Sequence, residues 1–272
     1  MSVFTENPVL YKEIAMRFQL RRQSKANRVV IYSIVGLIIP LFYWFSLRAM
    51  LHDYNGARDA FGLFLTALEV SLVVLLTPAM LASTITLERE KQTWNALLLS
   101  KLTPSEIVAG KFIGGLLPTL VTLLVFFPLN IAAALLGKIS LSQFFLAHTL
   151  LLTTTLFYGA LGLFCSWACR RTQVATAAAA GLIALFVLGS PLALTLWQSV
   201  VGYSNYSNQS INFFPLWSNP YYAMAELTMN QNNSQSHPEL AVLLSIGSLI
   251  ASALLLLVVT RKLAHGPKEM SA

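Results

Sequence analysis

Charged residues are scarce in this sequence. Asp, Glu, Lys and Arg together make up 11% of the 272 residues, whereas 56% are hydrophobic. The interior of one soluble domain of this length is too small to bury so much apolar surface. The composition therefore predicts an all-α protein that crosses a membrane several times.

Cysteines are few, and the motifs of common catalytic sites are absent. The two cysteines, Cys165 and Cys169, are four residues apart, a spacing at which helical side chains do not easily reach disulfide geometry, and two thiols alone complete no metal site. Neither Gly-Lys pair has the upstream glycine and the following hydroxyl of a phosphate-binding loop. We therefore expect no enzyme activity, no metal and no directly bound cofactor in this chain.

The basic residues follow the pattern that orients membrane proteins. The net charge is +7, and all but three of the 18 Lys and Arg residues lie at the cytoplasmic ends of apolar segments if the amino terminus is cytoplasmic. The exceptions are Arg48, Arg58 and Lys138. This placement explains the charge without a nucleic-acid partner, so we expect none.

Six apolar segments are long enough to cross a membrane, which takes about 20 residues. Because the number of spans is even, the amino and carboxyl termini are both expected in the cytoplasm. The predicted spans cover residues 29–50, 61–86, 108–136, 141–168, 174–199 and 239–260.

One membrane domain, residues 29–262, is predicted, with a segment before it and a cytoplasmic tail, 263–272, after it. Residues 1–28 predict an amphipathic helix on the cytoplasmic membrane surface, because Asn7 and Pro8 suit a helix start and apolar residues then recur four apart. A solvated tail whose charges only set the topology is the alternative. Residues 201–238 combine a polar part with an aromatic part and predict short helices on the outer side, which dip into the outer leaflet or cap the spans.

Two ionisable residues, Glu69 and His148, lie inside predicted spans. A charged carboxylate near the centre of a span costs about 2.5–3.5 kcal/mol, so Glu69 is expected to face protein, water or a partner instead of lipid. Both residues are predicted at similar depths from the outer side, where they could pair and line a substrate pathway. A structural hydrogen-bonded pair, or a protonated Glu69, is the alternative.

The insert between the second and third spans, residues 87–107, is the most polar internal segment. Glu88, Arg89, Glu90 and Lys91 would cost on the order of 10 kcal/mol at bilayer depth, so they mark the exit into the cytoplasm. Apolar residues spaced three and four apart follow and predict a helix with one apolar stripe. That stripe consists of Trp94, Leu97 and Leu98.

A second helix start follows in the insert. Thr103 suits an N-cap, Pro104 the first helical position and Glu106 the third, which together predict a capping box. The insert is therefore predicted to be a helix–turn–helix that breaks near residues 100–102 and returns to the membrane as the third span.

The run "EREKQTWNALLLSKLTPSEIVAGK" in this insert resembles the corresponding segment of type-2 ABC-transporter permeases. That family pattern reads Glu-Arg-Glu, Gly-Thr, Leu-Leu, a short Ser/Thr-Pro turn, Glu-Ile and Gly-Lys. The amino-terminal "NPVLYKEIAMRFQLRR" is similar to the opening of bacterial members, and the two motifs together cover about 45 residues. The sequence departs from the pattern at Lys91 and Gln92, where many members carry Gly before Thr93.

The resemblance implies a permease subunit in a bacterial inner (plasma) membrane, surrounded by lipids, that serves an ATP-driven exporter. A separate cytoplasmic ABC ATPase subunit would bind ATP and Mg, and a second permease copy, identical or related, would complete the pathway. The amino-terminal helix would be a connecting helix and the insert a coupling helix that docks on the ATPase. The residues implied in this coupling are Glu88, Arg89, Glu90, Thr93, Trp94, Leu97, Leu98, Thr103, Pro104 and Glu106.

Two other functions fit a polytopic membrane protein. A secondary transporter would work alone on an ion gradient, although such carriers usually place several polar groups and broken helices at the membrane midplane. A membrane scaffold would use the motion of an ATPase without moving a substrate. The insert itself has an alternative interpretation as a helix that only lies on the membrane surface.

Overall fold

The computed structural model describes residues 8–17, 37–48, 51, 57–100, 102–135, 141–201, 219–229 and 238–265. Within these ranges the chain consists of α-helices and the short turns between them, with no strand. The predicted all-α class of a polytopic membrane protein is therefore confirmed. Five helical segments are long and apolar enough to cross a membrane. The first runs from α3 (Ala57–Ala82) to Glu90, beyond the end of that helix. The others lie in α6 (Pro104–Leu135), α7 (Leu141–Ala168), α8 (Thr172–Val201) and α11 (Pro238–His265).

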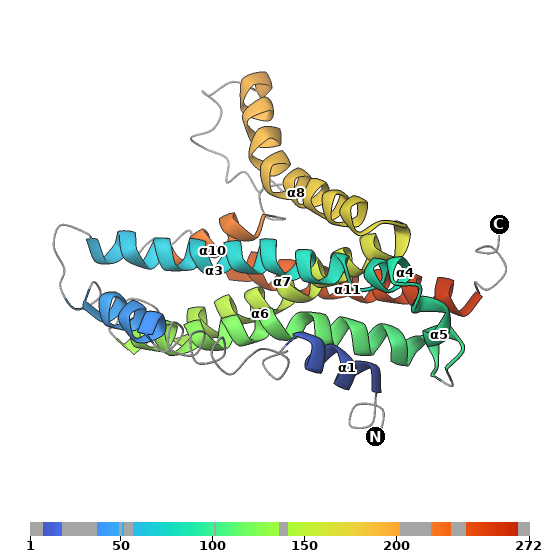
Figure 1. Ribbon diagram of the computed structural model, residues 1–272. Helices are drawn as coiled ribbons and strands as arrows, with labels where there is room; N and C mark the ends of the chain where they lie inside the picture. Colours follow the sequence, from blue (N-terminus) through green and yellow to red (C-terminus); the bar gives the residue numbers. More distant parts are fainter. Residues whose placement is uncertain are drawn as a thin grey trace.

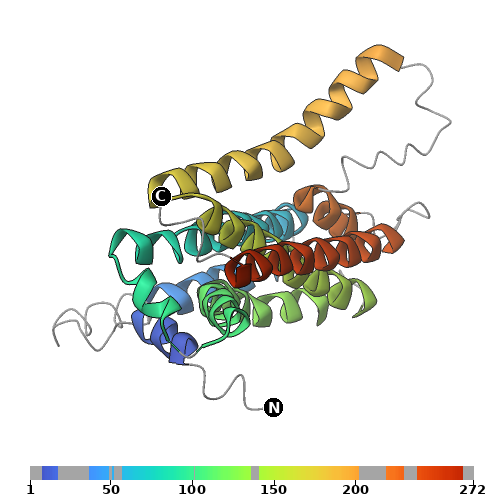
Figure 2. The same cartoon turned by 90° about the vertical axis from the view of Figure 1, so that its right-hand side faces the viewer.

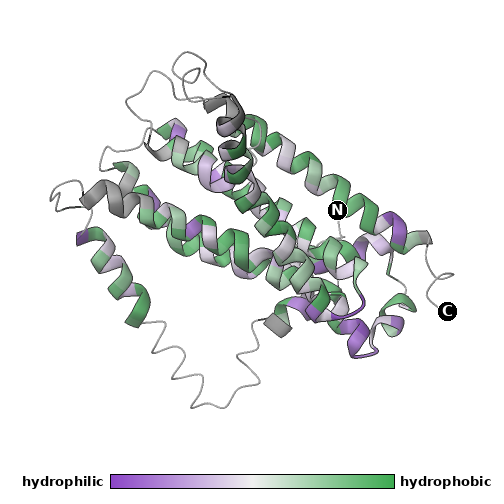
Figure 3. Ribbon diagram, turned by 90° about the horizontal axis from the view of Figure 1, so that it is seen from above, coloured by the Kyte–Doolittle hydropathy of each residue, from purple (hydrophilic) through white to green (hydrophobic). Residues whose placement is uncertain are grey.

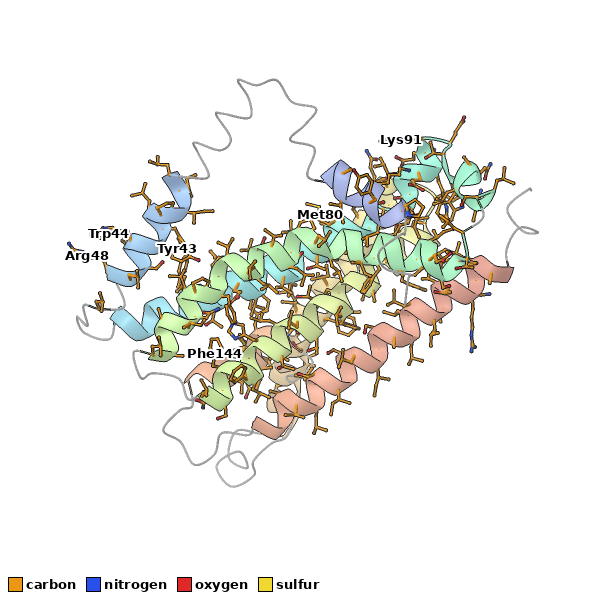
Figure 4. All side chains as sticks on the ribbon, turned by 90° about the horizontal axis from the view of Figure 1, so that it is seen from below. Tyr43, Trp44, Arg48, Met80, Lys91 and Phe144 are labelled. Atoms are coloured by element: carbon orange, nitrogen blue, oxygen red, sulfur yellow. The ribbon has the colours of Figure 1, made fainter. Side chains whose placement is uncertain are left out.

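The first predicted span, residues 29–50, is described only in part. Its described portion is the apolar helix Leu37–Arg48, which is shorter than the other spans. Phe42 and Phe126 of α6 form an edge-to-face pair with ring centroids 5.8 Å apart, and the Tyr43 hydroxyl donates to the carbonyl of Val125. Trp44 and Arg48 lie on the side of this helix that points away from the bundle, and the Arg48 guanidinium is 5.3 Å from the centre of the Trp44 ring (Figure 4). Six spans and two cytoplasmic termini remain predictions.

Helix α7 occupies the centre of the bundle, and α3, α6, α8, α10 (Pro220–Met229) and α11 pack around it (Figures 1 and 2). Glycines permit this close packing. A Cβ atom at Gly162 of α7 would lie 2.8 Å from the Cα and carbonyl oxygen of Pro78 in α3. Only a residue without a side chain fits there, so the backbones of α3 and α7 are in direct contact in the last two turns of both helices.

Helix α8 is the exception to this compact arrangement. Its first half packs on α3 and α7, whereas its second half bends away from the bundle (Figures 1 and 2). Pro191 lies in this second half. From Leu185 onward many side chains of α8 are exposed in the single chain, among them Leu185, Leu188, Leu192 and Leu196.

The two ends of the bundle differ in polarity. Hydrophilic residues gather at the end where α4 (Thr86–Glu90) and α5 (Trp94–Leu98) lie, whereas the middle of the long helices is mainly hydrophobic (Figure 3). Helix α1 (Pro8–Arg17) packs on α6 near the same end (Figure 1). We call this the insert end of the molecule. Of the predicted amino-terminal segment 1–28, only α1 lies within the described residues.

Candidate functional site

The insert consists of two short helices instead of one continuous arm. Helix α3 ends at Ala82, a turn follows, and then come α4, a second turn at Lys91 and Gln92, and α5. The predicted break near residues 100–102 is present, because residues 99, 100, 102 and 103 are not helical; Lys101 lies outside the described residues. The two earlier breaks were not predicted. In Figure 4, Lys91 lies at the outer side of the turn between α4 and α5.

The turn after α4 is a Schellman motif. The amide of Thr93 donates to the carbonyl of Glu88 (2.9 Å), and the amide of Gln92 donates to the carbonyl of Arg89 (3.0 Å). Gln92 has a φ of 58°, which is the left-handed conformation that this motif requires at its C′ position. Glycine usually occupies such a position because it has no Cβ to clash. This is also where many relatives in the resembled family carry Gly.

Replacing Gln92 by glycine is expected to stabilise the chain. A left-handed conformation costs an ordinary residue roughly 1 kcal/mol, and Gly removes that cost, so Gln92→Gly should raise the free energy of unfolding by about 0.5–1 kcal/mol. Thermal unfolding of the purified chain in detergent measures the change. Gln92→Ala is the matched control, since Ala keeps the Cβ; equal melting temperatures for the two variants would contradict the prediction.

The start of α4 is fixed by a serine from α7. The amides of Ile85 and Thr86 both donate to the hydroxyl oxygen of Ser166, at 2.9 and 3.2 Å. Ser166 is fully buried. The first free amides of a helix need such acceptors, so Ser166 holds the insert to the end of α7.

Four charged residues form a cluster between α1, α4 and α6. Lys111 of α6 is fully buried, and its ammonium lies 3.3 Å from Glu13 Oε1 and 3.2 Å from Glu88 Oε1 and donates to the carbonyl of Thr84 at 3.0 Å. Lys12, half exposed, donates to the same oxygen of Glu88 at 3.0 Å. We call Lys12, Glu13, Glu88 and Lys111 the charge cluster. The formal charges of the four residues cancel, so the cluster ties the insert to α1 and α6 without adding a net charge.

A glycine on α6 makes room for α1 at this cluster. A Cβ at Gly114 would lie 2.5 Å from Cβ of Glu13. The absence of a side chain at Gly114 lets α1 approach α6 closely enough for Glu13 to reach Lys111, three residues earlier on α6. Val9, one turn before Glu13, is buried as well, whereas Tyr11 and Ile14 are exposed.

Arg89 and Glu90 join the insert to the corner between α7 and α8. The Arg89 guanidinium donates through Nη1 to the carbonyls of Trp167 and Cys169, both at 2.8 Å. Glu90 Oε1 accepts the amide of Thr172, the first residue of α8, at 2.7 Å. A carboxylate at a helix amino terminus is favourable because it satisfies a free amide and the helix dipole. The insert therefore contacts the beginning of α8 as well as the end of α7.

The apolar stripe of the insert is divided between core and surface. Trp94 is 4% exposed and packs in a cluster with Leu81, Ile85 and Phe112, and Leu97 packs against the same cluster. Leu98 is 37% and Leu99 86% exposed. This corrects the predicted docking face, because Trp94 contacts the chain itself and the outward apolar surface consists of Leu98 and Leu99.

The predicted capping box at the start of α6 is confirmed. The amide of Thr103 donates to Glu106 Oε2 at 2.8 Å, and the amide of Glu106 lies 3.3 Å from the hydroxyl oxygen of Thr103. Two amides at the helix start are thereby satisfied reciprocally. Thr103 and Glu106 come shortly after α5 in the sequence, and they lie on the same side of the fold as the exposed end of that helix.

The ten residues predicted to couple to an ATPase form an inner and an outer group. Glu88, Arg89 and Trp94 are inner: each is buried or half-buried and uses its side chain within the chain. For Glu88 and Arg89, contacts with α1, α6 and α7 thus replace the predicted polar contacts with a partner. The outer group is exposed or half-buried and comprises Glu90, Thr93, Leu97, Leu98, Thr103, Pro104 and Glu106.

Residues that the sequence reasoning missed complete the insert end. Lys12 and Glu13 were seen only as part of a charged helix, and Lys111 only as part of a Gly-Lys pair. The signal that could have found Lys111 is its place in an otherwise apolar helix start, where a lysine needs a carboxylate partner. Ser166 gave no signal, since a single serine near a helix end is common.

Glu69 and His148 lie in the other half of the bundle and have separate partners. Glu69 is 3% exposed, and both of its carboxylate oxygens accept from Nδ2 of Asn130 in α6, at 3.3 and 3.1 Å. His148 Nδ1 donates to the carbonyl of Phe144 at 2.9 Å, and its Nε2 has no hydrogen-bond partner among the described residues. The predicted pair is therefore not formed; an amide from α6 takes its place at Glu69.

Aromatic rings enclose His148. Its ring centroid lies 4.2 Å from that of Phe144 and 5.2 Å from that of Phe127 of α6. Phe144 lies near the start of α7, far from Lys91 and the insert (Figure 4). Glu69 thus links α3 to α6, and His148 links α7 to α6. A role of either residue in a substrate pathway stays a prediction.

Comparison with known protein families gives a match over most of the chain. The model of a family described as "ABC-2 family transporter protein" matches residues 67–265, which include the insert, α6, α7, α8, α10, α11 and most of α3. No curated protein matches the chain.

Proposed function

The chain belongs to the ABC-2 transporter family and is a multi-pass membrane permease, and we propose that it serves an ATP-driven exporter whose ATPase is a separate cytoplasmic subunit. The observation that carries this proposal is the form of the insert end. An exposed apolar surface, Leu98 and Leu99, lies on a segment whose buried side is fastened to α1, α6, α7 and α8. A surface of this kind suits a partner that must move several helices at once.

The fastening supports transmission of motion from the insert to the membrane helices. Glu88 connects the insert to α1 and α6 through Lys12 and Lys111, and Arg89 connects it to α7. Glu90 connects it to the first residue of α8. A force applied at α5 would thus reach α8, the helix that lies furthest from the bundle, through short and mostly charged contacts. Closure of two ATPase subunits could in this way change the tilt of the helices.

Partner, direction and location complete the proposal. ATP and Mg would bind to the ATPase subunit, and this chain would contribute no catalytic group. A second copy of the chain or a related permease would form the other half of the pathway, with the exposed apolar surface of α8 available for that contact. The exporter direction and a bacterial inner membrane rest on the resemblance of the insert and the amino-terminal helix to permeases of that kind.

A charge on the exposed tip of α5 tests the proposed docking. Leu99→Asp places a carboxylate where an apolar contact with the ATPase is proposed, and the loss of one central contact of this kind should weaken binding at least about thirtyfold. Purification of the tagged chain from membranes, followed by quantification of the copurified ATPase subunit, measures the effect. The matched control is Leu135→Asp, since Leu135 is 82% exposed at the far end of α6.

The outcomes separate the candidate functions. Loss of the ATPase subunit in Leu99→Asp, with the control unaffected and both variants equally stable, supports the docking surface. Equal recovery of the ATPase subunit with both variants would contradict it. A wild-type chain that is purified without any ATPase subunit and transports on an ion gradient would instead be a secondary transporter.

A further inference from the structure

The start of α10 forms polar contacts with two different helices, near the middle of α3 and near the middle of α8. The side-chain amide of Asn219 donates to the carbonyl of Val187 at 3.0 Å and to the hydroxyl of Ser190 at 2.9 Å, both in α8. The hydroxyl of Tyr221 donates to that of Ser71 in α3 at 2.9 Å. Asn219 and Ser190 are 7% and 5% exposed, so water competes little for the bond between them.

The bond to Val187 corrects a defect in α8. In an α-helix the carbonyl of residue 187 accepts the amide of residue 191, but residue 191 is a proline and has no N–H. An unpaired carbonyl in an apolar environment is costly. Within α8 this carbonyl receives only a long bond from the Ser190 hydroxyl, at 3.4 Å. The side chain of Asn219 supplies the shorter one, and it does so at the place where α8 begins to leave the bundle. The bend of α8 and the attachment of α10 are therefore one hydrogen-bonded unit.

Asn219 is also the N-cap of α10. Its Oδ1 accepts the amide of Tyr221 at 3.0 Å, and its carbonyl accepts the amide of Ala223 at 3.1 Å, with Pro220 at the first helical position. Ala223, Met224 and Leu227 of α10 are then buried in the core between α3 and α7. One asparagine side chain thus starts α10 and holds it to α8.

This first turn crosses one end of an apolar groove between α3 and α8. The groove has a volume of about 240 Å³ and is lined by Val74, Leu75 and Ala79 of α3 and by α8 residues from Thr176 to Leu188, and Tyr221 borders it. Tyr221 is bound to α3 and Asn219 to α8, so α8 cannot move away from α3 at this end unless one of the two attachments breaks.

We propose that Asn219 and Tyr221 form a latch that closes this end of the groove between α3 and α8, and that the latch opens during the transport cycle. The opening of the latch during the cycle rests on the proposed function. Motion that reaches the first residue of α8 through Glu90 would tilt that helix, and the latch is the polar attachment that resists separation of its middle from α3. Three buried or part-buried hydrogen bonds between neutral groups are strong enough to hold a resting state and weak enough to break once per cycle.

Asn219→Ser is the sharpest variant for this latch. Serine remains a good N-cap for α10, but it carries no amide donor for Val187. Spin labels at Leu192 of α8 and Leu243 of α11, which are 61% and 63% exposed, report the position of the second half of α8 relative to the bundle. Both native cysteines are replaced by alanine, and the distance distribution is measured by pulsed electron resonance in nanodiscs.

The expected result is a shift in population. The labelled parent chain should show one main distance, and Asn219→Ser should raise the ratio of longer to main distance about tenfold. Ser199→Ala is the control, because that hydroxyl donates only within α8, to the carbonyl of Leu196, and it should leave the distribution unchanged. In Pro191→Ala, residue 191 regains its N–H, so adding Asn219→Ser should have a smaller effect than in the parent chain.

The outcomes of this experiment distinguish the latch from the proposed function. An unchanged distribution in Asn219→Ser would overturn the latch whether or not an ATPase subunit binds. Suppose that the ATPase subunit copurifies and hydrolyses ATP, while the distance in the parent chain stays the same when the complex is held in its ATP-bound state. In that case the latch does not open in the transport cycle, and this part of the proposal fails. If no ATPase subunit binds, the proposed function fails while the nucleotide-free comparison still decides the latch.

Discussion

Replacing Lys111 by methionine is expected to lower the free energy of unfolding by about 3–5 kcal/mol, because it leaves two buried carboxylates without their shared cation. Methionine is similar to lysine in length and fills the same space with apolar atoms. The loss would therefore come from Glu13 and Glu88, of which 5% and 7% are exposed. Unfolding of the purified chain in mixed micelles, followed by circular dichroism, measures the change.

Neutralising the two carboxylates as well should restore stability. In the triple variant Lys111→Met, Glu13→Gln, Glu88→Gln no buried ion remains, and most of the lost free energy is expected to return. Lys12→Met is the control, because Lys12 is half exposed and its pair with Glu88 is worth at most about 1 kcal/mol. A triple variant no more stable than Lys111→Met, or equal losses for Lys111→Met and Lys12→Met, would contradict the charge cluster as described.

The second large effect is expected at the contact between α3 and α7. Gly162→Ala adds a methyl group whose carbon would lie 2.8 Å from backbone atoms of Pro78. Backbone atoms cannot rotate away as the end of a side chain can, so the two helices must separate, at a cost of about 2–3 kcal/mol. The same unfolding experiment measures this loss.

Another glycine in a transmembrane helix serves as the control for that substitution. A Cβ at Gly247 of α11 would meet no atom within 4 Å. Gly247→Ala should therefore be neutral or should stabilise the chain by up to about 1 kcal/mol, which is the gain from helix propensity. If both variants lost the same amount of stability, close packing at Gly162 would not explain the loss.

The sequence predicted the helical architecture well because apolar runs of span length have few other solutions in a membrane. The predicted span 141–168 coincides with α7, and 174–199 lies within α8. The predicted span 61–86 was expected to continue as a helix into the insert, whereas the structure has a turn between α3 and α4. The turn that follows Ala82 is stabilised by Ser166, which is distant in sequence, so local patterns gave no sign of it.

The candidate site was predicted in place but only partly in detail. The capping box at Thr103 is a local pattern with a local cause, and it is confirmed. The roles of Glu88 and Trp94 depend on whether α1, α6 and α7 lie behind them, which no local pattern contains. A stripe of Trp and Leu looks the same whether it faces a partner or the core, and here Trp94 faces the core while Leu98 faces outward.

The amide contacts were the least predictable from sequence. Asn130 at Glu69 and Asn219 at Val187 are both single asparagines in or near apolar helices. In each case the partner lies on another helix, so the need for an amide appears only after the helices are assembled. Pro191 did offer a hint, since a proline within a span leaves one carbonyl that needs a donor from elsewhere.

ATP hydrolysis by the complex in nanodiscs tests the central claim most directly, namely that the exposed tip of α5 receives the motion of a separate ATPase. Wild-type chain and Leu99→Asp are compared with equal amounts of added ATPase subunit. The account predicts that the wild-type chain changes the hydrolysis rate and that Leu99→Asp returns it to the rate of the ATPase subunit alone. A Leu99→Asp chain that changed the rate as much as the wild type would contradict the claim.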